Sequence, residues 1–228
     1  MPFNAVKSRT SERFNEVLIF LNYVSLEEPT NPTEAVPLEV KIMKGLFYVH
    51  LYSAFEKSIN DVVETMLSLI SSRCVKNNHL LAPVLSVVLI DKIKSLKACG
   101  YSKLFTKSSD VFIDAASTTI TPINETIFSG HLQNVWVKTI DEIFITLGMG
   151  PVSLDMRSKT TIDEVVEKRN AVAHGRDSAA SVGERYRVNV LRGKMEILSS
   201  SINEIINSIE EYYISKRFIK PAVRRHYV

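Results

Sequence analysis

Three residues in the C-terminal half of the chain combine types that could carry out chemistry together. Arg169, Asn170 and His174 lie within the stretch "EKRNAVAHGRDSA", between two segments with helical patterns. An arginine can hold two phosphate oxygens at once, and a histidine can move a proton near neutral pH. A permanent cation beside an imidazole therefore suits a phosphodiester, with proton transfer as the chemistry.

Helical geometry leaves open whether these residues act on one ligand. Five steps of about 100° place His174 roughly 140° around the helix from Arg169. Gly175 follows directly, so His174 lies in the last turn, and the long arginine side chain could reach the same point beyond the helix end. The alternative is structural: Arg169 would pair with Glu167 or another neighbour, and His174 would cap backbone carbonyls.

Several other chemistries lack their sequence patterns. There is no H-E-x-x-H, no Cys or His pair at metal-ligand spacing, no phosphate-binding G-x-x-x-x-G-K-[ST] and no G-x-S-x-G. "GMGPVS" begins like a glycine-rich loop but has no third glycine, and we interpret it as a turn. Asp163, Glu164 and Glu167 lie early in their predicted helix, where carboxylates favour the helix dipole. We therefore expect neither a metal site nor a cofactor.

The composition is that of a globular protein of one domain covering residues 1–228. Of the 228 residues, 45% are hydrophobic and 23% charged, and only 8 are glycine and 8 proline, which favours long helices. Cys74 and Cys99 form no C-x-x-C pair, which is typical of a reducing compartment. The N-terminus has no signal-peptide core, and no apolar run is long enough to span a bilayer. These features predict a cytoplasmic protein with no membrane partner.

Apolar spacing predicts an all-α bundle of about six helices, without internal repeats. The most regular segment is 43–70, where Met43, Phe47, Leu51 and Phe55 begin a stripe that continues to Ile70 at three- and four-residue spacing. The other predicted helices cover residues 11–23, 84–100, 132–147, 161–174 and 181–213. Within 84–100, "VLSVVLI" could instead form a short buried strand. Residues 27–37 contain three prolines and form a loop, and residues 101–130 are the least regular part.

Helix ends give more local predictions. Thr161 with Glu164, and Ser181 with Glu184, are capping-box patterns that mark helix starts. Gly175 is the residue type favoured just after a helix end.

The C-terminal residues 214–228 are basic. No acid follows Glu211, while the segment contains Lys216, Arg217, Lys220, Arg224 and Arg225. This segment could contact phosphates, or it could be a solvated, frayed tail.

The motif resembles the active-site motif of the HEPN superfamily. In that superfamily an arginine, a polar residue that is often asparagine, and a histidine four to six positions after the arginine form the site, and Arg169, Asn170 and His174 match. Ala173 and Gly175 fit the local form of the prokaryotic RiboL-PSP and MAE-type HEPN families.

The resemblance extends to two further segments. "HLYSAFEKSINDVV" looks like the long earlier helix of those families, with an aromatic–acid pair at Phe55 and Glu56, and "SERFNEVLIFL" resembles their N-terminal helix. About half of the chain is covered in this way, and residues 75–130 stand outside it.

The resemblance implies a HEPN-like helical bundle and, in many members, a metal-independent endoribonuclease that serves as a toxin or in defence against phage. It implies a homodimer in which two motifs face each other, and a partner such as an antitoxin or another defence protein. Glu56 is implied to approach Arg169 or His174, although a solvated position is the alternative. Lys168, Arg176, Lys216 and Arg217 are expected to bind RNA. The competing functions are an inactive nucleic-acid-binding module and a helical interaction protein.

Overall fold

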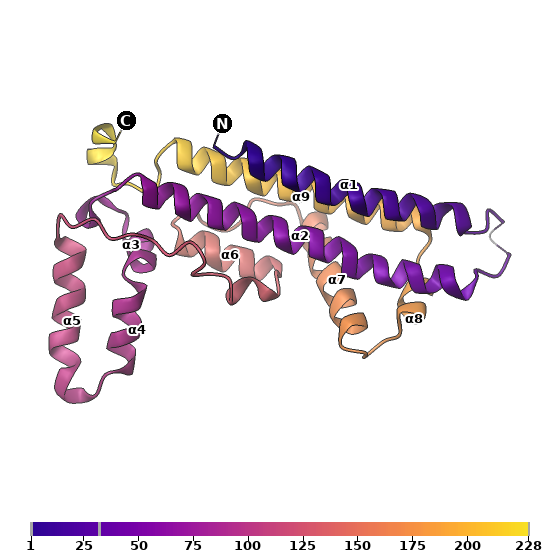
Figure 1. Cartoon of the computed structure of the whole chain (residues 1–228), viewed down its shortest axis with the longest axis horizontal. Coiled ribbons are helices and arrows are strands. Elements are labelled where there is room, and N and C mark those ends of the chain that lie inside the picture. The colour runs from indigo at the N-terminus through magenta and orange to yellow at the C-terminus, as the bar shows by residue number, and fades with distance from the viewer. Residues whose placement is uncertain (1, 32, 228) are drawn as a thin grey trace. The chain divides into compact units, whose positions relative to one another are not determined.

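The computed structural model describes residues 2–31 and 33–227, and these residues are helical with no β-strand (Figure 1). The prediction of an all-α fold is confirmed. The α-helices are α1 (Asn4–Glu27), α2 (Leu38–Ser72), α3 (Ala82–Val88), α4 (Ile90–Ala98), α5 (Tyr101–Ala116), α6 (Val137–Thr146), α7 (Met156–Ala173), α8 (Ala179–Glu184) and α9 (Val188–Ile214). Short 3₁₀ turns are η1 (Asn77–His79), η2 (His131–Gln133) and η3 (Pro221–His226). Within the described ranges, no helix combines the length and apolar character needed to cross a membrane.

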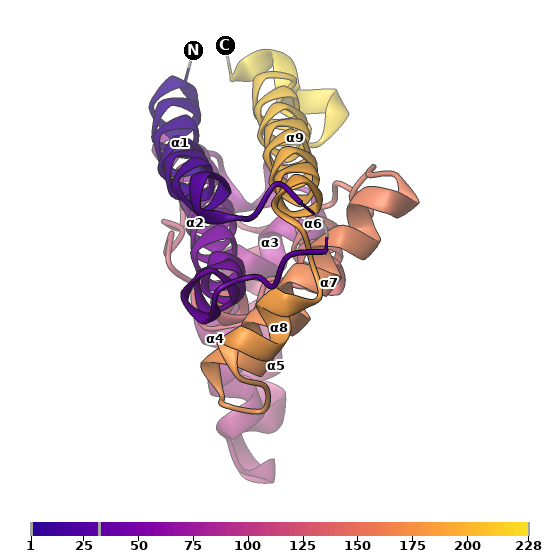
Figure 2. The ribbon, with the colours of Figure 1, turned by 90° about the vertical axis from the view of Figure 1, so that its right-hand side faces the viewer.

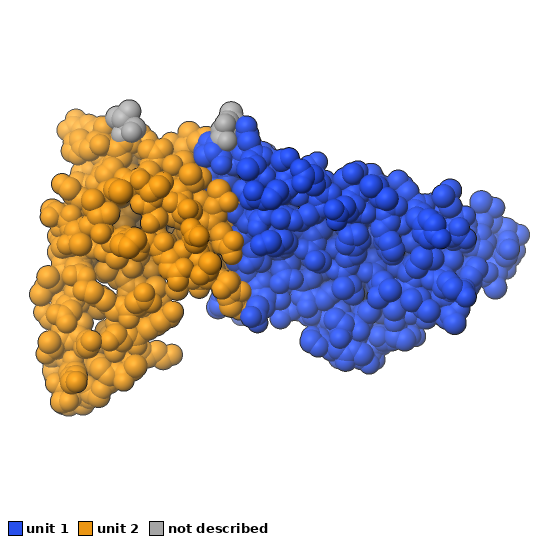
Figure 3. Space-filling model, viewed as in Figure 1, with its two compact units in different colours: residues 1–61, 131–139, 153–207 blue, residues 62–130, 140–152, 208–228 orange. Residues whose placement is uncertain are grey.

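The chain divides into two compact units (Figure 3). Unit 1 comprises residues 1–61, 131–139 and 153–207, and unit 2 comprises residues 62–130, 140–152 and 208–228. The long helices α2 and α9 contribute residues to both units. The single HEPN-like domain expected from the sequence stays a prediction.

In unit 1, α1 runs antiparallel to the first part of α2 and also lies beside α9 (Figures 1 and 2). The rings of Phe20 and His50 meet edge to face at 5.7 Å, and farther along, Arg13 Nη2 bonds Asp61 Oδ2 at 2.6 Å. The apolar stripes of these helices form the core of the unit, because periodic side chains on three helices can be buried together. Its fully buried members include Val17, Leu21, Phe47, Leu51, Phe55, Leu198 and Ile202.

The start of α2 passes very close to α8. A Cβ added at Gly45 would lie 2.0 Å from the carbonyl oxygen of Ala179, and one added at Gly183 would lie 1.9 Å from the carbonyl oxygen of Lys41. Real side chains do not fit at such distances, so the two backbones touch only because both residues are glycines.

In unit 2, α4 and α5 form a helical hairpin held by polar contacts. Lys107 Nζ bonds Ser95 Oγ at 2.9 Å, and Lys92 pairs with Asp114. The opposite side of α5 exposes aromatic rings, with Tyr101 79% and Phe112 74% accessible.

Residues 101–130 are more regular than the sequence predicted, and that expectation is wrong for 101–116, which form α5. No residue of α5 is buried, and its large apolar side chains are exposed, so this helix adds nothing to the hydrophobic core. Residues 84–100 do not form one helix either, because the backbone leaves helical geometry at Leu89, with φ −94° and ψ 13° between α3 and α4. The strand alternative for this segment is not adopted.

Several predicted helix starts are also wrong, including those of the first two helices, which begin at Asn4 and Leu38 rather than at 11 and 43. α7 begins at Met156, where Asp155 accepts a bond from Ser158 N at 2.6 Å, and Thr161 lies inside the helix. α8 begins after Ser178, whose side chain caps Ser181 N at 3.1 Å, so Ser181 is not the cap. α6 begins at Val137 rather than near 132, because the preceding residues form the turn η2.

Candidate active site

The end of α7 fixes the backbone of the motif histidine. His174 is the C-terminal cap of α7, and Gly175 follows with φ +68°. Gly175 N bonds the carbonyl oxygen of Val172 at 3.2 Å, and Arg176 N bonds that of Ala171 at 2.9 Å. This pair of bonds is a Schellman motif, which needs the left-handed conformation that glycine adopts without strain. The exposed side chain of His174 is therefore carried on an ordered backbone.

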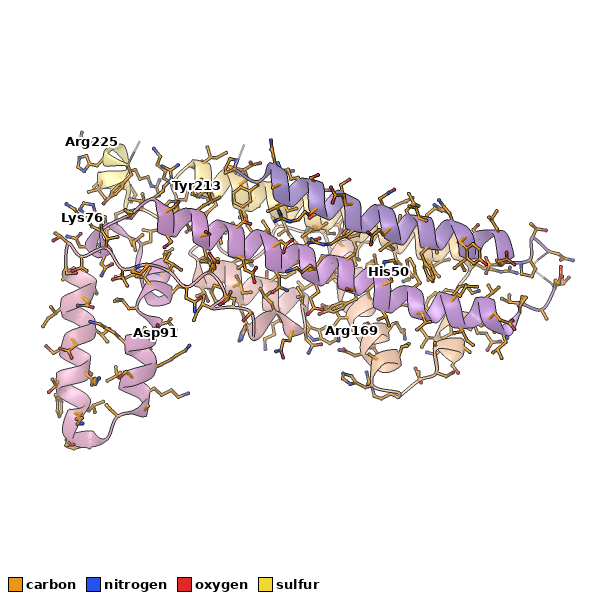
Figure 4. The ribbon with its side chains drawn as sticks, viewed as in Figure 1. His50, Lys76, Asp91, Arg169, Tyr213 and Arg225 are labelled. Carbon is orange, nitrogen blue, oxygen red and sulfur yellow. The ribbon has the colours of Figure 1, made fainter. Side chains whose placement is uncertain are left out.

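Arg169 is held against α2 (Figure 4). Its Cζ lies 3.7 Å from the ring centroid of Tyr52, within the range of a cation–π interaction. Its Nη2 donates to Asn134 Oδ1 at 3.2 Å and lies 3.5 Å from the carbonyl oxygen of Gln133. The sequence had left open an ion pair between Arg169 and Glu167. The guanidinium instead contacts Tyr52, Asn134 and Gln133. These contacts also pack α7 against α2.

Tyr52 joins the arginine to the turn before α6. Its hydroxyl accepts a bond from the buried Val135 N at 2.9 Å, and its oxygen lies 3.4 Å from the carbonyl oxygen of Gln133. Burial raises the pKa of Tyr52, and the nearby Glu56 raises it further, while the bond from Val135 and the charge of Arg169 lower it. The hydroxyl therefore stays neutral and holds the turn in place beneath Arg169.

Glu56 lies one turn after Tyr52 on α2 and is half-buried. Burial raises the pKa of its carboxyl above the usual value, although the charge of Arg169 and a bond with Tyr52 both lower it. The charge of Arg169 therefore acts on the Glu56 carboxyl, and the role that the resemblance implies for Glu56 stays a prediction. A carboxylate at this place can orient a guanidinium.

Two polar atoms of the motif are buried without a hydrogen-bond partner. These are Arg169 Nε, a donor, and Asn170 Oδ1, an acceptor. An unpaired buried polar atom costs about 1–3 kcal/mol. Such atoms need a reason, and a bound ligand that supplies an acceptor and a donor is one.

The expected position of the α7 acids is wrong: the helix begins at Met156 with no acid in its first turn, so Asp163, Glu164 and Glu167 lie in its middle and not near its positive end. Two of these acids have structural partners instead. Asp163 Oδ1 accepts a bond from Val137 N at 2.9 Å, which holds the start of α6. Glu164 Oε1 accepts from Tyr186 at 2.8 Å, and its other oxygen pairs with Lys194 at 2.5 Å. In residues 2–31 and 33–227, no group of three or more His, Cys, Asp or Glu side chains is arranged to hold a metal ion.

The expected RNA-binding residues lie in both units. Lys168 is half-buried and Arg176 exposed beside the motif in unit 1. Lys216 and Arg217 belong to unit 2.

Comparison with protein families confirms the resemblance to a HEPN family. The profile of the RiboL-PSP-HEPN family matches residues 8–215. The chain belongs to the RiboL-PSP HEPN family. Membership of this HEPN family indicates a nuclease or a nucleotide-binding module. Searches of curated proteins and of solved structures found no match.

Two functional neighbours of Arg169 were not predicted from the sequence. Tyr52 is an aromatic residue one helical turn before Glu56, and this spacing was the available signal, because residues four apart share a helix face. Asn134 has no such signal, since it comes from a turn far from the motif in sequence, and only the fold brings it to Arg169.

Proposed function

We propose that this HEPN protein is a metal-independent endoribonuclease that acts as a toxin or as an effector of phage defence. The observation that carries the proposal is the arrangement of α7. Its motif arginine is ordered by Tyr52 and Asn134, while its motif histidine is exposed on a fixed helix end. An ordered cation and an accessible proton carrier are the groups that cleavage by the RNA's own 2′-hydroxyl requires.

In the proposed reaction, His174 takes the proton of the 2′-hydroxyl or gives one to the 5′-leaving oxygen. The 2′-oxygen forms a bond to phosphorus, and the bond from phosphorus to the 5′-oxygen breaks, which leaves a 2′,3′-cyclic phosphate. Arg169 stabilises the negative charge that builds on the non-bridging oxygens. The overall step needs no oxidant and no added nucleophile.

Asn170 and Glu56 have positioning roles in this proposal. The unpaired Asn170 Oδ1 is an acceptor, so it suits a donor such as a ribose hydroxyl or a protonated imidazole. Glu56 keeps the guanidinium of Arg169 turned toward the site from its place beside Tyr52.

A homodimer is part of the proposal, because one arginine and one histidine make a sparse site and a two-fold axis doubles both. An outer apolar face on α1 and α2 supports it. This outer apolar face consists of Ile19, Tyr23, Leu26, Leu38, Ile42 and Leu46, which are between 38% and 82% exposed. Glu56 lies 18 residues after Leu38 on α2, about five helical turns, so these two residues lie on the same side of that helix.

The dimer is tested by Leu26→Arg. Leu26 is 82% exposed, so the change should leave the folded protein intact but place charges in the interface. We expect analytical ultracentrifugation to show a dimer for the parent protein and a monomer for the variant. Ile145→Arg, in unit 2 and 56% exposed, is the matched control and should remain dimeric. A parent protein that is monomeric at micromolar concentration and fully active would contradict the dimer.

Cleavage of RNA by the purified protein tests the function itself. We expect cutting to persist in EDTA, the upstream product to end in a 2′,3′-cyclic phosphate, and a 2′-deoxy nucleotide at the cut site to block the reaction. His174→Ala should abolish cutting and any toxicity on expression, whereas His226→Ala, at another exposed histidine, should not. RNA binding without cutting would identify the protein instead as a HEPN binding module.

A change of the arginine separates charge from geometry. Arg169→Lys keeps the positive charge but loses the two-pronged fork and the stacking surface, so activity should be severely reduced. Arg157→Lys, an exposed arginine on the same helix, is the matched control.

A further inference from the structure

In unit 2, the C-terminal segment is not a frayed tail, because it pairs with residues 79–81. Leu81 N bonds the carbonyl oxygen of Phe218 at 2.9 Å, and Lys220 N bonds that of His79 at 2.9 Å, on either side of an antiparallel bridge between Leu80 and Ile219. The Tyr227 hydroxyl then contacts His79 Nδ1 at 2.7 Å. Two segments far apart in sequence are therefore fixed side by side.

This pairing gathers cations without any acid between them. The basic cluster consists of Arg73, Lys76, Lys216, Arg217, Lys220, Arg224 and Arg225. The sequence contains no Asp or Glu from Arg73 to Ile90 and none after Glu211. Gathering like charges works against folding, so such a cluster indicates a surface that meets a polyanion. Figure 4 shows Lys76 and Arg225 at the same end of this unit.

Part of the basic cluster is held in place by the fold. Arg224 Nε donates to the carbonyl oxygen of Ile219 at 2.8 Å, and Lys220 Nζ donates to that of Asn78 at 2.8 Å. Arg73 Nε donates to the Tyr213 hydroxyl at 3.0 Å. These bonds hold the three side chains through neutral oxygen atoms, so their positive charge is retained.

Three other members of the cluster point their charge to solvent. Lys76, Arg217 and Arg225 are exposed, and their segments are ordered by the pairing described above. Apolar neighbours such as Phe218 and Ile219 are fully buried beneath them. The surface is thus cationic outside and apolar only inside.

We propose that the basic cluster binds the phosphate backbone of single-stranded RNA, as a docking surface separate from the Arg169–His174 site. The choice of RNA rests on the proposed function, whereas the contacts themselves need only phosphates. An anionic lipid surface fits less well, because peripheral binding also uses exposed apolar side chains. Across residues 73–80 and 216–227, all of which the structure describes, none of the large apolar side chains is exposed.

The magnitude follows from counterion release. Each phosphate contact to a single strand contributes about 0.7 to the slope of log affinity against log salt, so removing three contacts should lower the slope by about 2. At about 0.15 M salt the same three contacts correspond to an affinity change of roughly 50-fold.

The experiment measures binding of a fluorescein-labelled single-stranded RNA by anisotropy at several salt concentrations. The parent for all comparisons is the full-length His174→Ala protein, so binding is measured without cleavage. The test variant adds Lys76→Gln, Arg217→Gln and Arg225→Gln. The matched control adds Lys94→Gln, Lys97→Gln and Lys103→Gln, which remove the same charge from exposed positions in the same unit.

We expect the test variant to lose roughly 50-fold in affinity and about 2 in salt slope, and the control to lose much less on both measures. Equal loss in both variants would mean that only net charge matters and would overturn the proposal. So would unchanged RNA binding combined with lost binding to phosphatidylserine vesicles, which would identify a lipid surface. If the protein with His174 intact does not cut RNA, but the test variant still loses affinity and salt slope as expected, the docking surface is supported and the proposed nuclease activity is refuted.

Discussion

Substitutions of Tyr52 can separate the contribution of its hydroxyl group from that of its aromatic ring. Its hydroxyl accepts the hydrogen bond of the buried Val135 N–H, and its ring lies beneath Arg169. Tyr52→Phe removes the first and keeps the second, whereas Tyr52→Leu removes both. The pair of variants therefore tests whether the turn and the arginine are held by different parts of one side chain.

The expected magnitudes follow from these contacts. In Tyr52→Phe, a buried N–H loses its acceptor, which should lower the free energy of unfolding by about 1–3 kcal/mol. For a chain of this size each kcal/mol corresponds to about 2–4 °C, so a cost of about 2 kcal/mol lowers Tm by roughly 4–8 °C. Tyr52→Leu also loses a partly buried cation–π contact worth about 1–2 kcal/mol, which should reduce cleavage by about 10-fold.

The assay combines thermal unfolding by circular dichroism with RNA cleavage well below the melting temperature. Tyr52→Phe should be less stable but close to the parent in cleavage rate, and Tyr52→Leu should be impaired in both. The reasoning would be refuted if Tyr52→Phe melted with the parent protein, or if Tyr52→Leu cut RNA at the parental rate.

Three further predictions concern the helix end and the two buried carboxyls. Gly175→Ala, at φ +68°, should cost about 1 kcal/mol and slow cleavage by displacing His174, and a melting curve with a rate measurement would show both. Burial raises the pKa of Glu56, so its contribution to stability is present below the ordinary value of 4.5 and is lost as pH rises through the folded pKa. The Tm of Glu56→Gln should therefore rise relative to the parent as pH increases from 4.5 through the folded pKa, and a falling difference would contradict this. Burial acts to raise the pKa of Asp61, but bonds from Arg13 and Lys57 outweigh it and hold that pKa low, so its stabilisation is present above 3.8 and lost as pH falls through the folded value. Acid titration should accordingly destabilise the parent more steeply than Asp61→Asn.

The sequence allowed the long helices and the motif's place to be predicted, because both depend on local or periodic signals. The stripe from Met43 to Ile70 matched α2, and Gly175 marked the end of α7. Local signals were ambiguous where two residues could cap the same helix. Asp155 starts α7 although Thr161 has the stronger pattern, because the Asp155 carboxylate caps Ser158 N and the helix then continues through Thr161.

The other errors arose where the fold departs from the usual rule that apolar residues face inward. Tyr101, Phe105 and Phe112 recur at helical spacing on one face of α5, but that face is exposed and the helix buries no residue. The contact between Asn134 and Arg169 could not be predicted, because it joins a turn to a helix 35 residues later and depends on Tyr52 from a third element.

The glycine crossing of α2 and α8 has a consequence for how mutations in this protein will be distributed. The segment from His174 to Ser178 joins α7 to α8, and α8 is pressed against α2 at Gly45 and Gly183. Any side chain at either glycine must push α8 away, and the displacement passes to the short segment that starts with the motif histidine. If expression of the protein is toxic, as proposed, a selection for surviving cells should therefore recover inactivating changes at these two glycines as well as in the motif. Such a mutational map would reveal the contact between two backbones, although neither glycine carries a group that can react.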